Sequence, residues 1–504
     1  MSDRILRISV ERASAAGPAA RAVADTAAEL GLSGAERTQL EALLSEAFAA
    51  IVEDSFDGAD EISIDIEVVH EPGQVDIVVQ QHGAPSTYVS GTLPARLEAL
   101  VNLGYADSVA FASDGVHGSE LRISQSLGTG GLVSDAGFVS DTEASEEQVL
   151  PVDDLVIRPI TPDDVIEVAR LYFRTYGYTK IGSPWIYEPE VFRHKLSEHL
   201  HEAVIAVTPS GRVVGHTGIL RSSANSPTAS GGPIAVEPAY RQHGLTNQMG
   251  AAFFPTVATL GLRGVFGEAV TAHPASQKAA LKLGGSEVGL VLGRQPADLE
   301  FLGFDGPGGF RRAVMVFYTS FGNSELETVH VPPRYREFVE RIYEKARMPR
   351  EVVSDLGRPP ADLPAESRFS TQLTAETKFA RIDVEAYGSD FLSALQGLIR
   401  QLERSQFEVI SVHLPLSDPL TAYFGAGLGE LGLSFNGLFP EQEDGDELIL
   451  GICFNLQDPD TIAVASDFGE EMKAYVLDDR AQILTRLETR ARSRASVARI
   501  LDAL

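Results

Sequence analysis

The chain has 504 residues, 44% of them hydrophobic and 22% charged, which provides apolar material for several buried cores and, by length, about three domains. Its formal net charge of −30, from 71 acidic and 41 basic residues, argues against binding to nucleic acid or to an anionic membrane surface. The sequence has no apolar run of membrane-spanning length, no signal-peptide pattern and a single cysteine, Cys453, and it therefore predicts a cytoplasmic protein.

Residues 1–130 are predicted to form an α+β domain. Apolar residues that alternate, or that recur at helical spacing, mark its elements. The expected strands are 4–10, 61–69, 74–81 and 119–127, and the expected helices are 19–30, 33–55 and 93–103. Ser33 is the expected N-cap of the second helix, because its hydroxyl can accept from a free backbone N–H there.

This order of elements resembles the Bergerat (GHKL) ATP-binding domain of anti-sigma-factor kinases, an α/β sandwich. Glu46 stands at that family's acidic position. However, Ala50 replaces the Asn that chelates Mg²⁺, and Gln81 replaces the Asp that accepts the adenine amino group. The resemblance therefore implies a degenerate domain that does not bind ATP. We expect it to act as a scaffold, to pair two copies of the chain as a homodimer, or to help bind an acceptor.

Residues 131–150 are Gly-rich and then acidic without periodicity, which predicts a linker. Residues 151–325 are predicted to form an α/β domain, with Thr161 and Pro162 starting its first helix. The expected strands are 155–160, 203–208, 212–221, 264–272, 288–293 and 313–318, and the expected helices are 161–174, 189–198 and a short one that ends near 282.

An apolar strand-like run, 234–236, leads through a turn into a predicted helix in the middle of this domain. Such a turn can hold an anion, because the first N–H groups of a helix are free and its dipole is positive there. From Val236 to Thr246 the spacing is Val-x-Pro-x-x-Arg-x-x-Gly-x-Thr. This spacing resembles the acyl-CoA pyrophosphate loop of the GNAT family of N-acetyltransferases, and the order of elements around it is similar to that fold.

The GNAT resemblance implies that acetyl-CoA or a longer acyl-CoA is the acyl donor. Backbone N–H groups of the turn would hold the pyrophosphate, an N–H of the preceding strand would stabilise the oxyanion, and a capped helix at 273–276 would lie beside the CoA tail. Thr246 stands where the family usually has Gly or Ala. The implied cofactor-binding residues are Ala235, Val236, Arg241, Gln242, His243, Gly244, Leu245, Thr246, His273 and Ser276.

Acyl transfer to an amine needs a base for the ammonium proton and an acid for the leaving thiolate. Glu268 lies on a strand among apolar residues, where burial would raise the pKa of a carboxyl group, and Glu237 lies beside the turn. The tyrosine that the family often uses as the acid is Ala280 here. Tyr176 and Tyr178 are possible replacements from a loop on the acceptor side, and Tyr178 is the candidate that we carry forward.

Residues 326–485 have Glu430-Leu431-Gly432, similar to Lys282-Leu283-Gly284, and an order of expected elements that resembles the second half of a GNAT fold. No acyl-CoA loop precedes them, so the resemblance implies a degenerate GNAT-like α+β domain. Its expected elements are helices at 335–345, 390–403 and 418–431 and strands at 379–385, 409–415, 433–439 and 448–454. Residues 486–504 are predicted to form a C-terminal helix. The eleven histidines and the single cysteine follow no metal-ligand spacing, so no metal site is expected.

The sequence as a whole favours an acyl-CoA-dependent N-acyltransferase in which an amine attacks the thioester directly. The acceptor would be a small molecule or a peptide bearing an amine, and the acidic charge is compatible with a basic acceptor, although most of it is expected on solvated surface. The alternative is a regulatory or interaction protein with an anti-sigma-like domain and a GNAT fold that senses CoA or is inactive.

Overall fold

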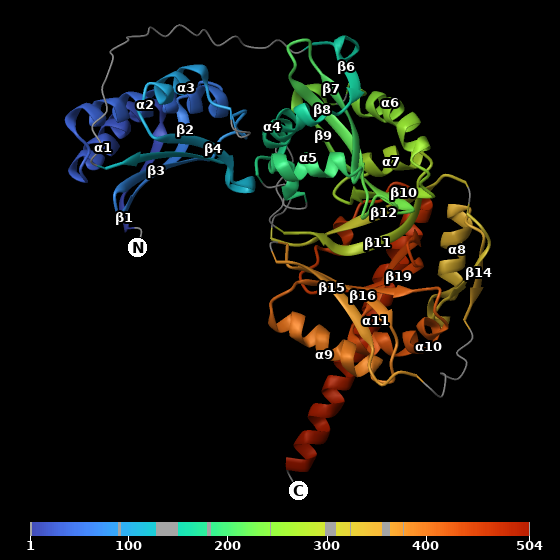
Figure 1. The fold of residues 1–504 in the computed structure, drawn as a ribbon. Coiled ribbons are helices and arrows are strands. Elements are labelled where there is room, and N and C mark those ends of the chain that lie inside the picture. The colour runs from blue at the N-terminus through green and yellow to red at the C-terminus, as the bar shows by residue number, and fades with distance from the viewer. Residues whose placement is uncertain are drawn as a thin grey trace. The chain divides into compact units, whose positions relative to one another are not determined.

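The computed structural model describes residues 3–88, 92–127, 150–178, 183–241, 243–297, 309–322, 324–354, 363–375 and 377–502. The chain forms two compact units, and Figure 1 shows its elements in chain order. Unit 1 is Met1–Thr217 with Ile234–Ala252, and unit 2 is Gly218–Pro233 with Phe253–Leu504. No helix in the described ranges is long and apolar enough to cross a bilayer. The predicted linker, 131–150, lies outside the described residues except for Leu150.

The first part of unit 1 is a five-stranded sheet in the order β1-β2-β3-β5-β4, with three helices on one face (Figure 1). Its strands are β1 (Asp3–Arg12), β2 (Glu61–Glu71), β3 (Gln74–Gln81), β4 (Ser108–Ser113) and β5 (Ser119–Ser126). Its helices are α1 (Ala16–Glu29), α2 (Gly34–Phe56) and α3 (Ala95–Asn102). Each predicted element is present within a few residues, and β4 was not predicted.

The core of this part follows from the sequence pattern. In the β2–β3 hairpin Ile66 pairs with Val79 and Val68 with Ile77, so the apolar residues of both strands share one face. That face packs against the apolar stripe of α2 in one buried cluster. The Ser33 hydroxyl accepts from the Glu36 N–H, and the Glu36 carboxylate accepts from the Ser33 N–H, so the predicted cap is confirmed as a capping box.

The second part of unit 1 contains the beginning of the central α/β region. Its elements are β6 (Val156–Pro159), α4 (Val165–Tyr176), α5 (Pro189–Ser197), β7 (His201–Val207), β8 (Val213–Leu220), β9 (Thr228–Val236) and α6 (Leu245–Thr259). The boundary between the units crosses β8, β9 and α6, so each of these belongs partly to unit 2. Strand β6 pairs antiparallel with β7, and α4 buries Val165, Val168 and Leu171 against them.

Unit 2 holds one long run of hydrogen-bonded strands in the order β15-β16-β17-β19-β18-β11-β12-β10. Its strands are β10 (Gly264–Val270), β11 (Ser286–Gln295), β12 (Arg312–Ser320), β13 (Glu327–His330), β14 (Arg350–Val353), β15 (Arg368–Thr374), β16 (Phe379–Ala386), β17 (Val409–Pro415), β18 (Ser434–Gln442) and β19 (Gly445–Cys453). Its helices are α7 (Ala275–Lys282), α8 (Arg336–Ala346), α9 (Phe391–Arg404), α10 (Pro419–Leu428) and α11 (Asp467–Asp502). The start of β9 runs parallel to β10.

In this sheet, β11 and β18 pair through two glycines, and this pairing connects the strands β15 to β18 with β11, β12 and β10. Gly289 and Gly437 face each other there. A Cβ added to Gly289 would lie 2.7 Å from the Asn436 carbonyl oxygen, and one added to Gly437 would overlap Gly289 Cα. Gly437 also has φ +140°, which side chains rarely adopt. The two strands can therefore approach only because neither residue has a side chain.

The architecture is a mixed α/β, multidomain chain. Three expectations need correction: β13, β14 and β15 were not predicted, β9 begins six residues before the expected 234, and α11 runs through the expected boundary at 485. The Bergerat-like identity of the first domain and the GNAT-like identity of the last remain predictions.

Candidate functional site

The turn between β9 and α6 lies wholly in unit 1. The Glu237 N–H donates to Val214 O at 3.0 Å, which ties the end of β9 to β8. A 3₁₀ turn follows, in which the Tyr240 N–H donates to Glu237 O at 2.9 Å. Tyr240 is buried, and its hydroxyl accepts from the Leu150 N–H at 3.2 Å. The predicted turn is therefore held at both ends by buried contacts.

Gly244 forms the last step into α6. Its φ of +80° favours glycine, and apart from its chain neighbours no described residue has an atom within 4 Å of where its Cβ would be. The Gly244 carbonyl accepts from the N–H groups of Asn247 at 3.0 Å and Gln248 at 3.2 Å. The N–H groups of Leu245 and Thr246 are then the ones that helix geometry leaves for an outside acceptor. The space in front of this helix start is open, as an anion site requires.

The other residues of the turn shape it. The Leu245 side chain is buried and anchors the helix, whereas His243, Gly244 and Thr246 are exposed. Arg241 Nε donates to Val236 O at 3.2 Å, and His243 Nδ1 donates to Arg241 O at 2.7 Å. The structure thus brings together the predicted residues from Ala235 to Thr246, except for Gln242, which lies outside the described residues.

Glu237 is held by two arginines. Its carboxylate lies 2.5 Å from Arg212 Nη2 and 3.4 Å from Arg174 Nε, and its side chain is 13% exposed. Burial lowers the pKa of Arg174, and Glu237 acts in the opposite direction. Arg174 also donates to Val213 O at 2.7 Å. A carboxylate in this position fixes the turn to α4 and β8, which is a different role from the base that the sequence suggested.

The two tyrosines near the end of α4 have separate partners. The Tyr178 hydroxyl donates to Gly83 O at 2.7 Å, a contact with the first domain. The Tyr176 hydroxyl donates to Ile234 O at 3.3 Å, two residues before the turn. Burial raises the pKa of both phenols, so they remain protonated at neutral pH. Tyr176 therefore contacts the strand that leads into the candidate acyl-CoA turn, whereas Tyr178 contacts the first domain.

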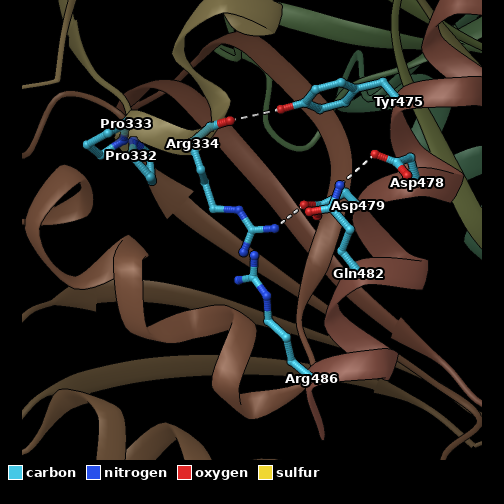
Figure 2. Close-up of a pocket in the computed structure, with 8 residues that line it drawn as sticks. All are labelled: Pro332, Pro333, Arg334, Tyr475, Asp478, Asp479, Gln482 and Arg486. Carbon is cyan, nitrogen blue, oxygen red and sulfur yellow. Dashed lines mark hydrogen bonds and ion pairs between the residues drawn. The ribbon is translucent and has the colours of Figure 1, made fainter. Parts of the chain in front are cut away.

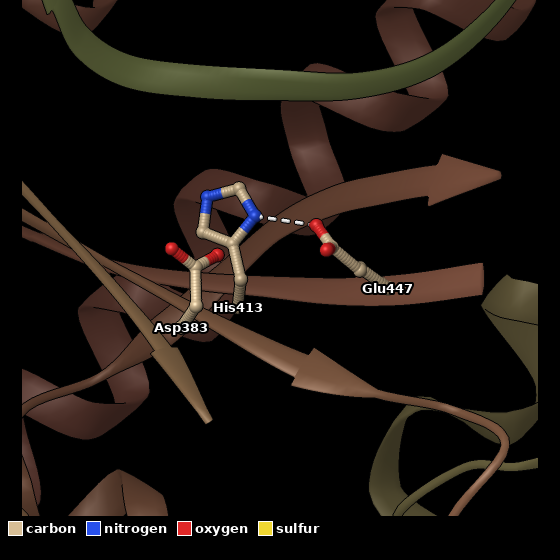
Figure 3. Close-up of side chains that lie close together, drawn as sticks. All are labelled: Asp383, His413 and Glu447. Carbon is tan, nitrogen blue, oxygen red and sulfur yellow. Dashed lines mark hydrogen bonds and ion pairs between the residues drawn. The ribbon is translucent and has the colours of Figure 1, made fainter. Parts of the chain in front are cut away.

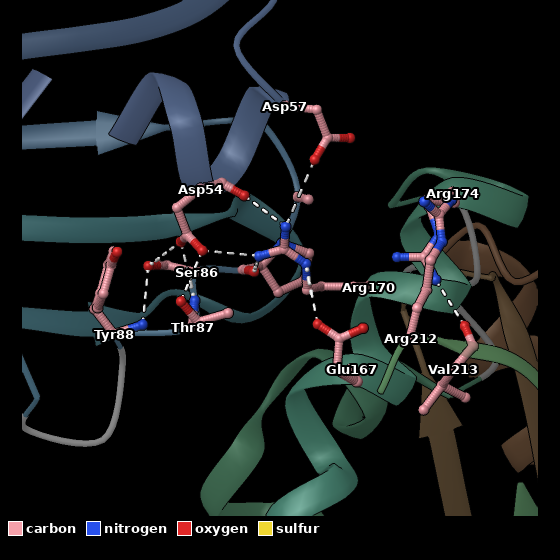
Figure 4. A network of polar contacts seen from close by, with 12 residues as sticks. Asp54, Asp57, Ser86, Thr87, Tyr88, Glu167, Arg170, Arg174, Arg212 and Val213 are labelled. Atoms are coloured by element: carbon pink, nitrogen blue, oxygen red, sulfur yellow. Dashed lines mark hydrogen bonds and ion pairs between the residues drawn. The ribbon is translucent and has the colours of Figure 1, made fainter. Parts of the chain in front are cut away.

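Arg170, one helical turn before Arg174, connects α4 to the first domain (Figure 4). Its guanidinium donates to Asp54 Oδ1 at 2.9 Å and to Asp54 O at 2.6 Å. The Asp54 carboxylate also accepts from the Ser86 hydroxyl at 2.8 Å and the Thr87 hydroxyl at 2.7 Å. The Arg170 and Asp54 side chains are only 11% and 7% exposed. Sequence reasoning missed this pair, because its members are 116 residues apart.

Glu268 lies in unit 2, and the expectation that it is buried is wrong. Its side chain is 43% exposed and pairs with Arg294 Nε at 3.1 Å. At this exposure water screens the ion pair, and the carboxylate is accessible to solvent.

The predicted cap of α7 also needs correction. The N-cap residue is Pro274, and no side chain caps the helix. Gln277 instead holds the helix in place, since its amide donates to Val270 O at 3.0 Å and to Ala463 O at 2.8 Å. Gln277 is buried, which is unusual for this residue type at an otherwise exposed helix. His273 and Ser276 remain predicted contacts of a CoA tail.

Gln81, at the position of the adenine-binding Asp, closes a local loop. Its side-chain oxygen accepts from the Gly83 N–H at 2.7 Å, and its nitrogen donates to Ala84 O at 3.2 Å. The side chain is buried. Both ends of the amide are therefore used inside the first domain, as a structural residue would use them.

A cavity of about 400 Å³ in unit 2 contains none of the predicted residues. It lies beside α11, and Figure 2 shows the guanidinium groups of Arg334 and Arg486 pointing toward one another across it. Arg334 pairs with Asp479, which also accepts from the Phe435 N–H at 2.8 Å. The Tyr475 hydroxyl donates to Arg334 O at 3.1 Å. These contacts tie α11 to the sheet, and we assign the cavity no chemistry.

Comparisons with known proteins bear on the central region. The solved structures similar to this chain include a spermidine/spermine N-acetyltransferase from Vibrio cholerae, with 12% identity, a TM-score of 0.26, and coverage of 34% of this chain and 95% of that one. They also include the ribosomal-protein-S18-alanine N-acetyltransferase from Escherichia coli, with 15% identity, a TM-score of 0.27, and coverage of 34% and 96%. No curated protein matches the chain. Residues 154–286 match the acetyltransferase (GNAT) domain family, which is the part of the chain that contains the turn between β9 and α6.

Proposed function

We propose that this protein is an acyl-CoA-dependent N-acyltransferase that acylates an amine of a small molecule or a peptide. The observation that carries the proposal is the open start of α6 behind Gly244, which lies inside the region that matches the GNAT family. The family match supports acyl transfer in general. The turn supports a specific place for the CoA pyrophosphate, because it offers backbone donors, a helix N-terminus and unoccupied space together.

In this proposal the N–H groups of Leu245 and Thr246 hold the pyrophosphate, and the exposed Thr246 hydroxyl adds a donor. Arg241 contributes positive charge while it braces the turn through Val236 O. The backbone N–H of Ala235 or Val236 polarises the thioester carbonyl. The amine nitrogen then attacks the carbonyl carbon, the carbon–sulfur bond breaks, and the CoA thiolate leaves with a proton from an acid.

The candidates for the acid and the base are compared by their exposure and by the hydrogen-bond partners of their side chains. Glu237 is held by two arginines, so it is not free to act as the base. Glu268 remains the candidate base that the sequence suggests, and its carboxylate is exposed. Tyr176 replaces Tyr178 as the proposed acid, because its phenol stays protonated and its hydroxyl contacts the end of β9, whereas the Tyr178 hydroxyl is bound to Gly83 O. Tyr178 is the matched comparison, since it is a partly buried tyrosine whose hydroxyl donates to the first domain instead.

A second candidate function is a CoA-sensing regulator that transfers no acyl group. Ala280, at the position of the usual acid, and Glu237, held by Arg174 and Arg212, both favour it. The two functions share the CoA site and differ only in turnover, so one assay separates them.

The test is release of CoA thiol from acetyl-CoA and longer acyl-CoAs in the presence of a panel of polyamines, amino-acid amides and Lys-containing peptides. Thiol can be detected with a colorimetric disulfide reagent, since the single cysteine, Cys453, is buried and burial raises the pKa of its thiol. The proposal expects amine-dependent release that Tyr176→Phe lowers by about 10–100-fold in kcat and that Tyr178→Phe leaves nearly unchanged. Saturable acyl-CoA binding without release for any amine would instead support the sensor.

A further inference from the structure

Three side chains that can bind a metal ion meet on one face of the sheet in unit 2 (Figure 3). Asp383 on β16 pairs in register with His413 on β17. Glu447 on β19 pairs with Pro415, two residues beyond His413, and so lies on the same face. One ligand atom from each residue lies within 4.8 Å of those of the other two. The register of three neighbouring strands therefore builds the cluster.

The contacts of His413 orient its ring. His413 is 4% exposed, and its Nδ1 lies 2.7 Å from Glu447 Oε2. Its Nε2 lies 3.1 Å from the Ser411 hydroxyl, two residues earlier on the same strand. A ligating histidine typically has a hydrogen-bond partner on its second ring nitrogen, which fixes the tautomer and the ring orientation. Ser411 is placed to be that partner when Nδ1 binds a metal.

We propose that Asp383, His413 and Glu447 form a binding site for a divalent transition-metal ion. His413 Nδ1 and Glu447 Oε2 are only 2.7 Å apart, so their lone pairs would repel each other without a proton or a metal ion between them. One imidazole nitrogen with two carboxylates is a mixed donor set, which suits Zn²⁺, Fe²⁺ or Mn²⁺ better than Ca²⁺ or Cu⁺. The ligand atoms must draw together slightly, because ligands about 2.1 Å from a metal lie at most about 4.2 Å apart.

Arg381 is the competing cation at this site. Its Nη2 lies 2.6 Å from Asp383 Oδ1 and 3.3 Å from Glu447 Oε2. The two carboxylates and this guanidinium leave one net negative charge for an incoming ion. Asp383 and Glu447 are 21% and 20% exposed, so an ion can reach them from solvent. A metal must displace Arg381 from one oxygen, which makes removal of this arginine a sharp test.

The experiment titrates Zn²⁺ into the full, chelator-treated chain by calorimetry and repeats the titration with Co²⁺ followed by visible absorption. The site predicts one equivalent of saturable binding and a cobalt absorption band that Zn²⁺ abolishes. His413→Asn and Asp383→Asn each weaken binding by at least about tenfold, and Arg381→Met tightens it. His330→Asn, a histidine change elsewhere in unit 2, leaves binding unchanged.

Asp383 is 21% exposed and His413 only 4%, so Asp383→Asn tests the ligand role even where His413→Asn fails to fold. Two results overturn the proposal. The first is the absence of saturable one-to-one binding of either metal up to about 1 mM. The second is one-to-one binding that Asp383→Asn leaves unchanged in a variant with native unfolding behaviour. In either case the cluster is an ion-pair network in which Arg381 supplies the only cation.

Discussion

Glu237 and Glu268 illustrate how the surroundings of a single residue decide its role. Both are glutamates at or near strands of the central region, and the sequence made both of them candidate bases. Glu237 lies between Arg174 and Arg212 and is 13% exposed, whereas Glu268 has one partner and is 43% exposed. The arginines reach Glu237 from helix α4 and from the turn before β8, at 63 and 25 residues away in sequence. No local pattern contains that information, so the sequence could nominate these residues but could not distinguish between them.

Asp164 allows a test of electrostatics at one residue. Its carboxylate accepts from the Thr161 N–H at 2.8 Å and from Arg158 at 2.7 Å. Burial alone would raise its pKa, but these hydrogen bonds outweigh it and hold the pKa of Asp164 below the usual value. Asp164→Asn should therefore cost about 1 kcal/mol of unfolding free energy at neutral pH.

The pH dependence of that loss has a definite sign. The folded carboxyl group has the lower pKa, so its contribution is complete above the unfolded pKa of about 4 and is lost as the pH falls through the folded pKa. Urea unfolding followed by the fluorescence of Trp185, the only tryptophan, should show the wild type and the variant converging on acidification. Asp163→Asn changes the exposed neighbour and is the control. A gap that stays constant down to about pH 3 would contradict this account.

At the scale of elements, the regular alternation of buried residues was the reliable signal. Strand β2 was predicted because its buried side chains alternate with outer ones. Strand β15 was missed, since it lies at the end of the sheet and none of its seven residues is buried. Strand β4, also at a sheet edge, buries only Phe111. Edge strands are set by pairing with a neighbour, and pairing leaves little trace in composition.

At the pairing of β11 with β18, adding one methyl group to Gly437 should lower the stability of the fold strongly. Gly437→Ala places a Cβ against Gly289 and forces a φ of +140° on a residue with a side chain. We expect a loss of at least about 2 kcal/mol, measured as a lower midpoint of thermal unfolding. Gly445→Ala is the matched control, because Gly445 also has positive φ but its Cβ would make only ordinary contacts. Equal midpoints for the two variants would contradict the close approach.

Helix α4 joins two parts of unit 1 through arginines one turn apart. Arg170 contacts Asp54 of the first domain (Figure 4). Arg174 contacts Glu237 at the turn. Arg170→Met leaves the buried Asp54 carboxylate without its cation, so we expect a loss of about 2–4 kcal/mol. Arg21→Met removes an exposed pair with Glu41 and should cost less than about 1 kcal/mol. Trp185 fluorescence on urea titration measures both variants, and similar losses would show that the Arg170 contact is not buried in solution.

At the scale of the whole molecule, the sequence predicted the site that is continuous in the chain and missed the clusters whose residues come from distant segments. The turn from Val236 to Thr246 is continuous in sequence, so its spacing was visible, and its described residues join the end of β9 to the start of α6. The cluster of Asp383, His413 and Glu447 draws on three strands and spans 64 residues, so neither its spacing nor its composition suggested a metal. The contact between the first domain and α4 likewise depends on tertiary packing.

The central claim is that the turn before α6 binds acyl-CoA. Calorimetry of acetyl-CoA with the full chain tests it most directly when the wild type is compared with Gly244→Trp and Gly211→Trp. Both glycines have positive φ and open space around them, but Gly211 lies in the turn between β7 and β8. The account predicts saturable binding by the wild type and by Gly211→Trp, and loss of binding in Gly244→Trp, whose side chain fills the space in front of the helix. Binding that Gly244→Trp leaves intact, or no binding by the wild type, would contradict it.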